Sequence, residues 1–366
     1  MHIGRTISAI ALLLLAAQRS YAGGNCFAWG NTVGYNSTVS PKPKYVDSDL
    51  WDPWGVAFLP GDAYVVADSY NGKSTVYDAT GLKKPQVLQL PLPAGSSLPH
   101  SYPTGLVANL NSQDFVNPGT SHPIQFIYST IEGTIVGWSK TLSAPELIVD
   151  NSSKLAVYYG AAIGNNVEGE HLYLTNFHSK TIDVFDASFA PVTLPGAFTD
   201  PGIPAGFAPF GITNIRDNLF VTYAAAAGDN FKQGKKQGYV DIFDTNGKLV
   251  TRFAANTHLN APWGVVEAPA NFGNFGGDIL VGNFGDGTIN AYDPAKGTYK
   301  GSIVDSVTKK PMSIPGLWAL FFGGGEAGDP GTLYFTARLS ETFFSGGFGP
   351  ITPQSAKQCS AAVTPY

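Results

Sequence analysis

Hydrophobic residues of this chain occur in short runs of four to six, cut by Gly, Pro, Asn and Asp, and the pattern recurs regularly. Each recurrence begins with one residue, mostly aromatic, followed by a small one. The six copies are Trp54-Gly55, Thr104-Gly105, Tyr159-Gly160, Phe210-Gly211, Trp263-Gly264 and Trp318-Ala319. They are 50, 55, 51, 53 and 55 residues apart. A fixed period in this range is typical of propellers, solenoids and arrays.

Each copy continues with the same series of predicted strands. In the first copy these are residues 56–58, 63–68, 74–78 and 85–90, which are rich in β-branched and aromatic residues and end at turn formers. Helical periodicity is nowhere sustained. We therefore predict an all-β fold, a six-bladed β-propeller with four-stranded antiparallel blades. The last copy lacks a fourth strand, and we expect the segment around Lys44-Tyr45-Val46 to supply it, so that an N-terminal strand closes the ring.

The N-terminus reads as a signal peptide over residues 1–22, with Arg5 before an apolar run at 7–17 and a small-residue cleavage site after Ala22. An uncleaved anchor is the alternative. We expect residues 23–366 to form a single propeller domain that is secreted, periplasmic or extracellular. In such a compartment the two cysteines, Cys26 and Cys359, are expected to form a disulfide. Asn36 and Asn151 would carry glycans only in a eukaryotic host.

Charge adds little to this picture. The net charge is −5, charged residues make up 13% of the chain, and the lysine pairs are isolated from one another. A nucleic-acid partner is therefore not expected. No segment after residue 22 is long and apolar enough to span a membrane. We expect a monomer that binds a small molecule or a peptide.

Several phrases carry a family resemblance. They are "DPWGVAF" from Asp52, "LPGAFTDPGIPAGFAPFGI" from Leu194, "APWGV" from Ala261, "GDILVGNFGDGTINAYDP" from Gly277 and "GDPGTLYFTA" from Gly328. These resemble a family of exported NHL-like propeller proteins across nearly the whole mature chain. The resemblance implies the fold and export, and it carries over no catalytic residue. More distantly the chain is similar to six-bladed lactonases and strictosidine-synthase-like propellers. The stretch "LSETFFSGGFG" from Leu339 departs from the family pattern.

Equal places in equal blades converge on the axis, so the residue before each small residue should ring one end of the channel. Five of the six are aromatic: Trp54, Tyr159, Phe210, Trp263 and Trp318. In the lactonase-like relatives this column can hold an Asn that ligates a divalent metal. The aromatic column here argues against a metal site and offers flat apolar faces to a planar or sugar-like ligand. The alternative is that the rings only plug the channel, and both possibilities remain open at this stage.

A second column, at the ends of the second strands and in the following turns, should form a rim around the same mouth. Its candidate ligand-binding residues are Asp68, Asn176, His178, Asn283 and Asp286. The alternative is that they are ordinary hairpin-turn residues. The longest insertion at this mouth, residues 224–237, reads either as a lid or as a tolerated surface loop.

The sequence supports three hypotheses about function. The first is a secreted propeller that binds a small apolar, aromatic or sugar-like ligand at the aromatic mouth of the channel. The alternative is an enzyme of lactonase-like lineage, a hydrolase, isomerase or lyase, with acid–base residues on the same face. The third is a surface interaction protein. No catalytic signature is present, no catalytic residue is assigned, and no cofactor is expected.

Overall fold

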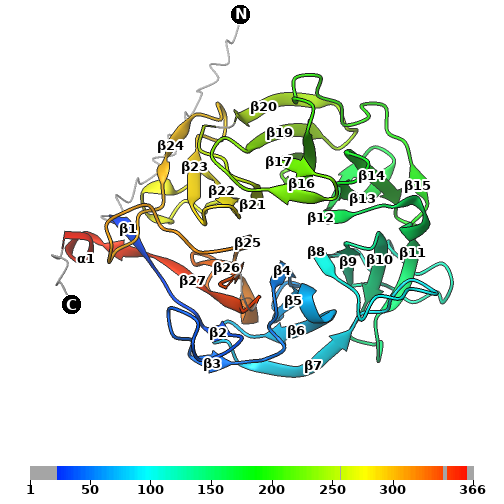
Figure 1. The fold of residues 1–366 in the computed structure, drawn as a ribbon, viewed down its shortest axis with the longest axis horizontal. Helices are drawn as coiled ribbons and strands as arrows, with labels where there is room; N and C mark the ends of the chain where they lie inside the picture. Colours follow the sequence, from blue (N-terminus) through cyan, green and yellow to red (C-terminus); the bar gives the residue numbers. More distant parts are fainter. Residues whose placement is uncertain (1–22, 256, 341–343, 361–366) are drawn as a thin grey trace, which may run out of the picture.

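The computed structural model describes residues 23–255, 257–340 and 344–360. Six β-sheets are arranged radially around a central axis, as Figure 1 shows. The predicted six-bladed propeller of four-stranded antiparallel blades is confirmed. Five blades are continuous in sequence. From the axis outward, blade 1 contains β4 (Pro53–Ala57), β5 (Tyr64–Asp68), β6 (Lys73–Tyr77) and β7 (Lys83–Gln89).

The next four blades repeat this order. Blade 2 consists of β8 (Pro103–Ala108), β9 (Phe126–Thr130), β10 (Thr134–Trp138) and β11 (Glu146–Asp150). Blade 3 consists of β12 (Tyr158–Asn166), β13 (Gly169–Asn176), β14 (Thr181–Asp186) and β15 (Pro191–Val192). Blade 4 consists of β16 (Phe207–Ile215), β17 (Asn218–Ala227), β19 (Gly238–Asp244) and β20 (Leu249–Ala255), with β18 (Asn230–Lys232) paired to β17. Blade 5 consists of β21 (Pro262–Glu267), β22 (Ile279–Asn283), β23 (Ile289–Tyr292) and β24 (Tyr299–Ser302).

Blade 6 joins the two ends of the described chain. Its inner strands are β25 (Leu317–Phe322), β26 (Leu333–Arg338) and β27 (Gly346–Ser355). Two N-terminal strands pair with β27, namely β1 (Gly23–Trp29) along one part and β2 (Val33–Gly34) along another. The segment expected to be the fourth strand, β3 (Tyr45–Val46), pairs in parallel with β2 and so lies one strand further out than expected.

The disulfide lies beside this closing sheet. Cys26 in β1 and Cys359 in the short helix α1 (Ala356–Ser360) are bonded, with their Cα atoms 5.6 Å apart. A disulfide of this kind is characteristic of oxidising compartments. The expected signal peptide, residues 1–22, lies outside the described residues. No helix in the described part of the chain is long and apolar enough to cross a membrane.

The repeated glycines are explained by contact between neighbouring first strands. A Cβ atom on Gly55 would lie 2.5 Å from the main-chain oxygen of Thr104, and one on Gly211 would lie 2.2 Å from that of Trp263. Only glycine lets the two backbones approach so closely. The first strand of every blade also has a bulge at this point, which turns the preceding side chain towards the axis.

Candidate functional site

The two ends of the central channel differ. The loops that lead into the first strands and the loops that join second to third strands lie on one side of the ring, which we call the front face. The first strands run from this face towards the opposite one, the back face. Residues just before the bulges therefore lie near the front, whereas the residues that follow them lie deeper, towards the back.

Five aromatic side chains meet at the front end of the channel, and we call them the aromatic cluster. Its members, all between 0% and 9% exposed, are Trp54, Tyr159, Phe210, Trp263 and Trp318. The rings of Trp54 and Trp318 stack with centroids 3.5 Å apart, and Trp54 stacks on Tyr159 at 5.4 Å. Trp263 packs edge-on against Trp54 and Trp318. Equal places in five blades thus converge on the axis and close the channel at this end.

Hydrogen bonds of the cluster are unevenly satisfied. The indole N–H of Trp318 donates to Asp52 Oδ1 at 3.0 Å, and that of Trp263 donates to the Tyr159 main-chain oxygen at 3.3 Å. The indole N–H of Trp54 is buried and has no hydrogen-bond partner. Burial raises the pKa of the Tyr159 phenol, and the charge of Asp229 raises it further, so this hydroxyl remains a donor. Unpaired buried donors are rare, and Trp54 therefore marks a place where an acceptor is missing.

Three of the five residues expected at the rim lie mainly inside the protein. Asp68 and Asn283 are fully buried and Asn176 is 4% exposed. Asp68 accepts a hydrogen bond from the Thr75 hydroxyl, and burial raises its pKa well above the usual range. Asn283 donates to the main-chain oxygen of His258 and accepts from the Asn260 N–H.

Asn176 plays a similar part in blade 3, where it accepts hydrogen bonds from the main-chain N–H groups of Val157 and Ser179. Like Asp68 and Asn283, it therefore fixes loops within the protein. The side chains of Asn176 and Asn283 are thus occupied by internal contacts, whereas Asp68 Oδ1 is buried without a hydrogen-bond partner.

The other two expected rim residues do reach the surface. Asp286 is exposed and accepts hydrogen bonds from the N–H and hydroxyl of Thr288, as a turn residue does. His178 pairs through Nδ1 with Asp229 Oδ1 at 2.7 Å, so its acidic partner comes from the insertion. Within the described residues, no three His, Cys, Asp or Glu side chains come together in a way that could hold a metal ion.

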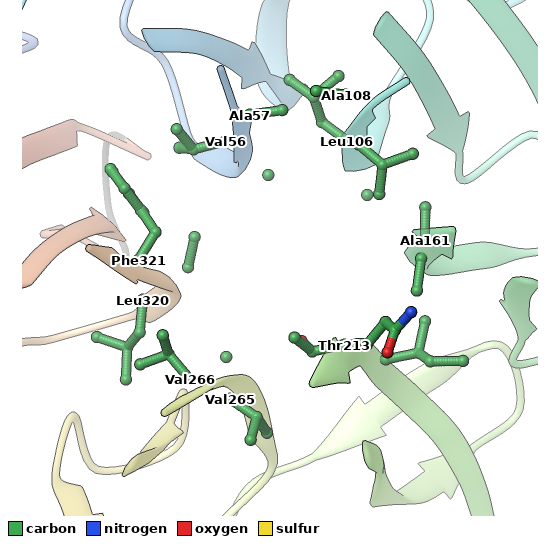
Figure 2. A pocket seen from close by; sticks show the side chains of 18 of the residues that line it. Val56, Ala57, Leu106, Ala108, Ala161, Thr213, Val265, Val266, Leu320 and Phe321 are labelled. Atoms are coloured by element: carbon green, nitrogen blue, oxygen red, sulfur yellow. The ribbon is translucent and has the colours of Figure 1, made fainter. Parts of the chain in front are cut away.

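Behind the aromatic cluster the channel opens into a cavity of about 390 Å³. The first strands of all six blades line it, and Figure 2 shows their side chains arranged around the central space. The lining is mainly aliphatic, as Val56, Leu106, Ala161, Val266 and Leu320 illustrate. Trp263 contributes to the inner end, whereas the partly exposed side chains towards the ends of the first strands lie at the back face.

Two polar side chains, Thr213 and Asn214, interrupt the apolar lining. The amide nitrogen of Asn214 donates to the Ile163 main-chain oxygen at 2.9 Å, but its carbonyl oxygen is buried without a partner. None of the described residues that line the cavity is charged. The cavity is thus lined mainly by apolar side chains. It was not anticipated from the sequence, although the small and aliphatic residues that follow each bulge were visible there.

A structural column that also went unnoticed in the sequence holds the bulges in place. It occupies equivalent positions in four second strands, opposite the bulges, and contains Ser129, Thr175, Thr222 and Thr336. Each hydroxyl accepts a hydrogen bond from the N–H of the small residue at the bulge of its own blade. Thr175 and Thr336 also donate to the main-chain oxygens of Phe210 and Trp54 in the next blade. These contacts fix the aromatic residues at the axis.

Comparison with solved structures agrees with the propeller fold. A streptogramin B lyase matches with a TM-score of 0.51 at 12% identity, covering 90% of this chain and 98% of that chain. A protein of unknown function from Bacteroides thetaiotaomicron matches with a TM-score of 0.54 at 10% identity, covering 89% of this chain and 76% of that chain. At such low identity the likeness shows the fold alone.

Sequence comparison relates the chain to two uncharacterised proteins of a virus. No family model matches it. Uncharacterized protein R648 of Acanthamoeba polyphaga mimivirus is 30% identical over 313 residues, which cover 83% of this chain and 76% of that protein. Uncharacterized protein L690 of the same virus is 30% identical over 309 residues, which cover 81% of this chain and 79% of that protein. With this identity over most of both chains, the protein belongs to the family that includes these two mimivirus proteins.

Proposed function

We propose that this propeller binds a small apolar, aromatic or sugar-like ligand in its central channel, against the aromatic cluster. The observation that carries the proposal is the cavity of about 390 Å³, lined by side chains from all six blades and ending at Trp263. Ligand pockets in proteins typically measure about 300–1,000 Å³ and have mostly hydrophobic walls with a few polar groups. This cavity has that size and composition.

The position of the polar groups narrows the kind of ligand. Most of the wall is aliphatic, so transferring an apolar ligand from water to this cavity is favourable by roughly 25 cal/mol per Å² buried. Thr213 and Asn214 are the only polar side chains among the described residues of the wall. An apolar or aromatic ligand with few polar groups therefore fits better than a sugar with many hydroxyls.

Binding is better supported here than acid–base catalysis. Proton transfer requires a titratable side chain within hydrogen-bond reach of the reacting atom. Among the described residues that line the cavity, Thr213 and Asn214 are the polar ones, and neither titrates near neutral pH. His178 lies with Asp229 near the front face, on the other side of the aromatic cluster.

We infer further that the protein is an exported monomer related to NHL-like propellers. The Cys26–Cys359 disulfide supports an oxidising compartment, and residues 1–22 have the composition of a signal peptide. N-terminal sequencing of the secreted protein should begin at Gly23. A mature chain that still begins at Met1 would contradict cleavage.

The channel proposal is tested by filling the cavity. Ala161 lines the cavity and is partly exposed, so Ala161→Trp should place an indole in the channel, and circular dichroism must show that the variant is folded. We expect the neutral dye N-phenyl-1-naphthylamine to bind the wild type saturably, and Ala161→Trp to weaken that binding at least tenfold. The control is Val87→Trp on the outer strand β7, where Val87 is 41% exposed. Equal dye affinity in the wild type and Ala161→Trp would refute a channel site.

A further inference from the structure

The insertion in blade 4 covers the front end of the channel with an aromatic side chain. After β17 the chain turns at Gly228 and pairs back as β18, with Ala226 opposite Phe231. We call residues 227–237 the flap. Most of its residues are exposed, whereas Phe231 is partly buried.

Phe231 fills a pit made of four aromatic rings from four different blades. Its ring centroid lies 4.5 Å from that of Phe210, 5.0 Å from Phe284, 5.8 Å from Trp318 and 6.0 Å from Tyr159. Three of these four rings belong to the aromatic cluster. The contacts with Phe284, Trp318 and Tyr159 are edge-to-face, which is a favoured geometry for aromatic pairs. The pit is thus built to receive a planar ring, and the chain supplies one of its own.

The flap is attached to the front face by few polar contacts. The Tyr159 hydroxyl donates to the Asp229 main-chain oxygen at 3.0 Å, and the Gly234 N–H donates to Asn260 Oδ1 at 2.7 Å. A third contact is the His178–Asp229 pair, whose side chains are 36% and 54% exposed. At the end of the flap, the Gln237 N–H donates to the Leu259 main-chain oxygen at 3.1 Å and the Ala261 N–H donates to the Gln237 main-chain oxygen at 3.0 Å, so this end is anchored. Exposed ion pairs contribute little to stability, and segments with few buried contacts open at a small fraction of the global unfolding free energy.

We propose that the flap is a displaceable cover and that the pit beneath it binds an aromatic ring of a ligand in place of Phe231. The ligand class follows from the occupant that the chain itself provides, a single six-membered aromatic ring. A polar substituent on the ring has two partners nearby. The Tyr159 hydroxyl loses its acceptor when the flap lifts, and the buried indole N–H of Trp54, which stacks on Trp318 and Tyr159, has none in the closed form. A phenol-type ring therefore suits the pit.

This second site does not depend on the channel proposal, because the aromatic cluster separates the two. The flap imposes a cost on binding, since the apparent dissociation constant is the intrinsic one divided by the fraction of molecules in which the flap is open. Weakening the attachment of the flap should therefore tighten the binding of a ligand that enters the pit. It should leave the binding of the dye in the channel unchanged.

The test uses 4-methylphenol as the probe and two matched histidine variants. His178→Ala removes the pair with Asp229, whereas His122→Ala removes an exposed pair of the same 2.7 Å length with Glu146 in blade 2. By isothermal titration we expect His178→Ala to bind the probe three- to tenfold more tightly than the wild type, and His122→Ala to bind it as the wild type does. Phe231→Ala should bind more tightly still. In that background His178→Ala should add nothing, because the cover is already lost.

Three outcomes would overturn this proposal. The first is equal probe affinity in His178→Ala and His122→Ala. The second is absence of probe binding by Phe231→Ala when circular dichroism shows it to be folded. The third is probe binding that Ala161→Trp abolishes and His178→Ala does not change, which would assign the phenol to the channel. Probe binding that persists in Ala161→Trp supports a separate site, even if the channel itself binds nothing.

Discussion

The contact between neighbouring first strands gives a direct test of how the repeat builds the ring, and Gly211→Ala is the sharpest form of it. A Cβ atom at position 211 would lie 2.2 Å from the Trp263 main-chain oxygen and 2.9 Å from the Thr222 hydroxyl oxygen. Carbon and oxygen atoms approach to about 3.3 Å even in the close contacts between β-strands. The strands β16 and β21 must therefore separate by roughly 1 Å, because the clashing oxygen belongs to the backbone.

The expected loss of stability has two parts. Forcing one extra methyl group into a closely packed interior costs about 1–3 kcal/mol. The new Cβ atom would also crowd the Thr222 hydroxyl oxygen in the same blade, and this strains the hydrogen bond from the Gly211 N–H to that hydroxyl, which is 2.8 Å long and fully buried. Leaving such a group unsatisfied costs about 1–3 kcal/mol. We expect Gly211→Ala to lower the unfolding free energy by about 2–5 kcal/mol, a large share of the roughly 5–15 kcal/mol typical of a folded protein.

Urea unfolding measures this loss, with tryptophan fluorescence and far-ultraviolet circular dichroism as two probes whose transitions should coincide. The control is Gly30→Ala, because a Cβ atom on Gly30 would have no neighbour within 4 Å. We expect that variant to stay within about 1 kcal/mol of the wild type. If Gly211→Ala also lies within 0.5 kcal/mol of the wild type, close contact between blades does not explain the repeated glycine.

Three further predictions concern stability. Replacing both Cys26 and Cys359 by Ser should lower the thermal midpoint without abolishing folding, at a cost of about 2–4 kcal/mol; a chain that no longer folds would contradict this. Because burial raises the pKa of Asp68, the contribution of this residue to the unfolding free energy should fall as the pH rises above about 4. In urea unfolding, the stability of Asp68→Asn relative to the wild type should therefore increase between pH 4 and pH 7. A wild-type advantage that grows over this range would refute the sign. Trp318→Ala should lower the unfolding free energy by about 3–5 kcal/mol and Trp263→Ala by less, since Trp318 is fully buried and Trp263 borders the cavity. Calorimetry would show which of the two variants is less stable.

The repeat in the sequence predicted the six blades because each carries its own strand pattern and the same small residue. The closing strand was placed less well. Tyr45-Val46 has the composition of a strand, but Val33-Gly34 is the segment that pairs with β27, and Tyr45-Val46 pairs with Val33-Gly34. Two-residue strands leave almost no pattern in a sequence, so the order of strands at the seam depends on where the preceding loop leads the chain.

The candidate site, too, could be predicted from the sequence only in part. The aromatic cluster followed from repeat register, because equal places in a ring of blades converge whatever the loops do. Of the expected rim residues, His178 and Asp286 are exposed, whereas a residue such as Asn283 is buried and holds a loop through its hydrogen bonds. The hydroxyl column left a signal that could have been used, since Thr175, Thr222 and Thr336 share one place in their strands. Ser and Thr are common in strands, and only the bulge reveals what they bind.

The arrangement of the first strands explains why one end of the channel is filled and the other is hollow. The bulge turns one large side chain per blade towards the axis at the front, and five such rings fill the narrow end. Beyond the bulge the strands alternate, and the positions that face the axis hold small or aliphatic residues such as Ala161 and Val266. A ligand in the cavity must therefore arrive from the back face and stop at Trp263. The Trp263 indole limits how deep the proposed ligand could enter, and the hydrogen bond from this indole to the Tyr159 main-chain oxygen holds it in one orientation.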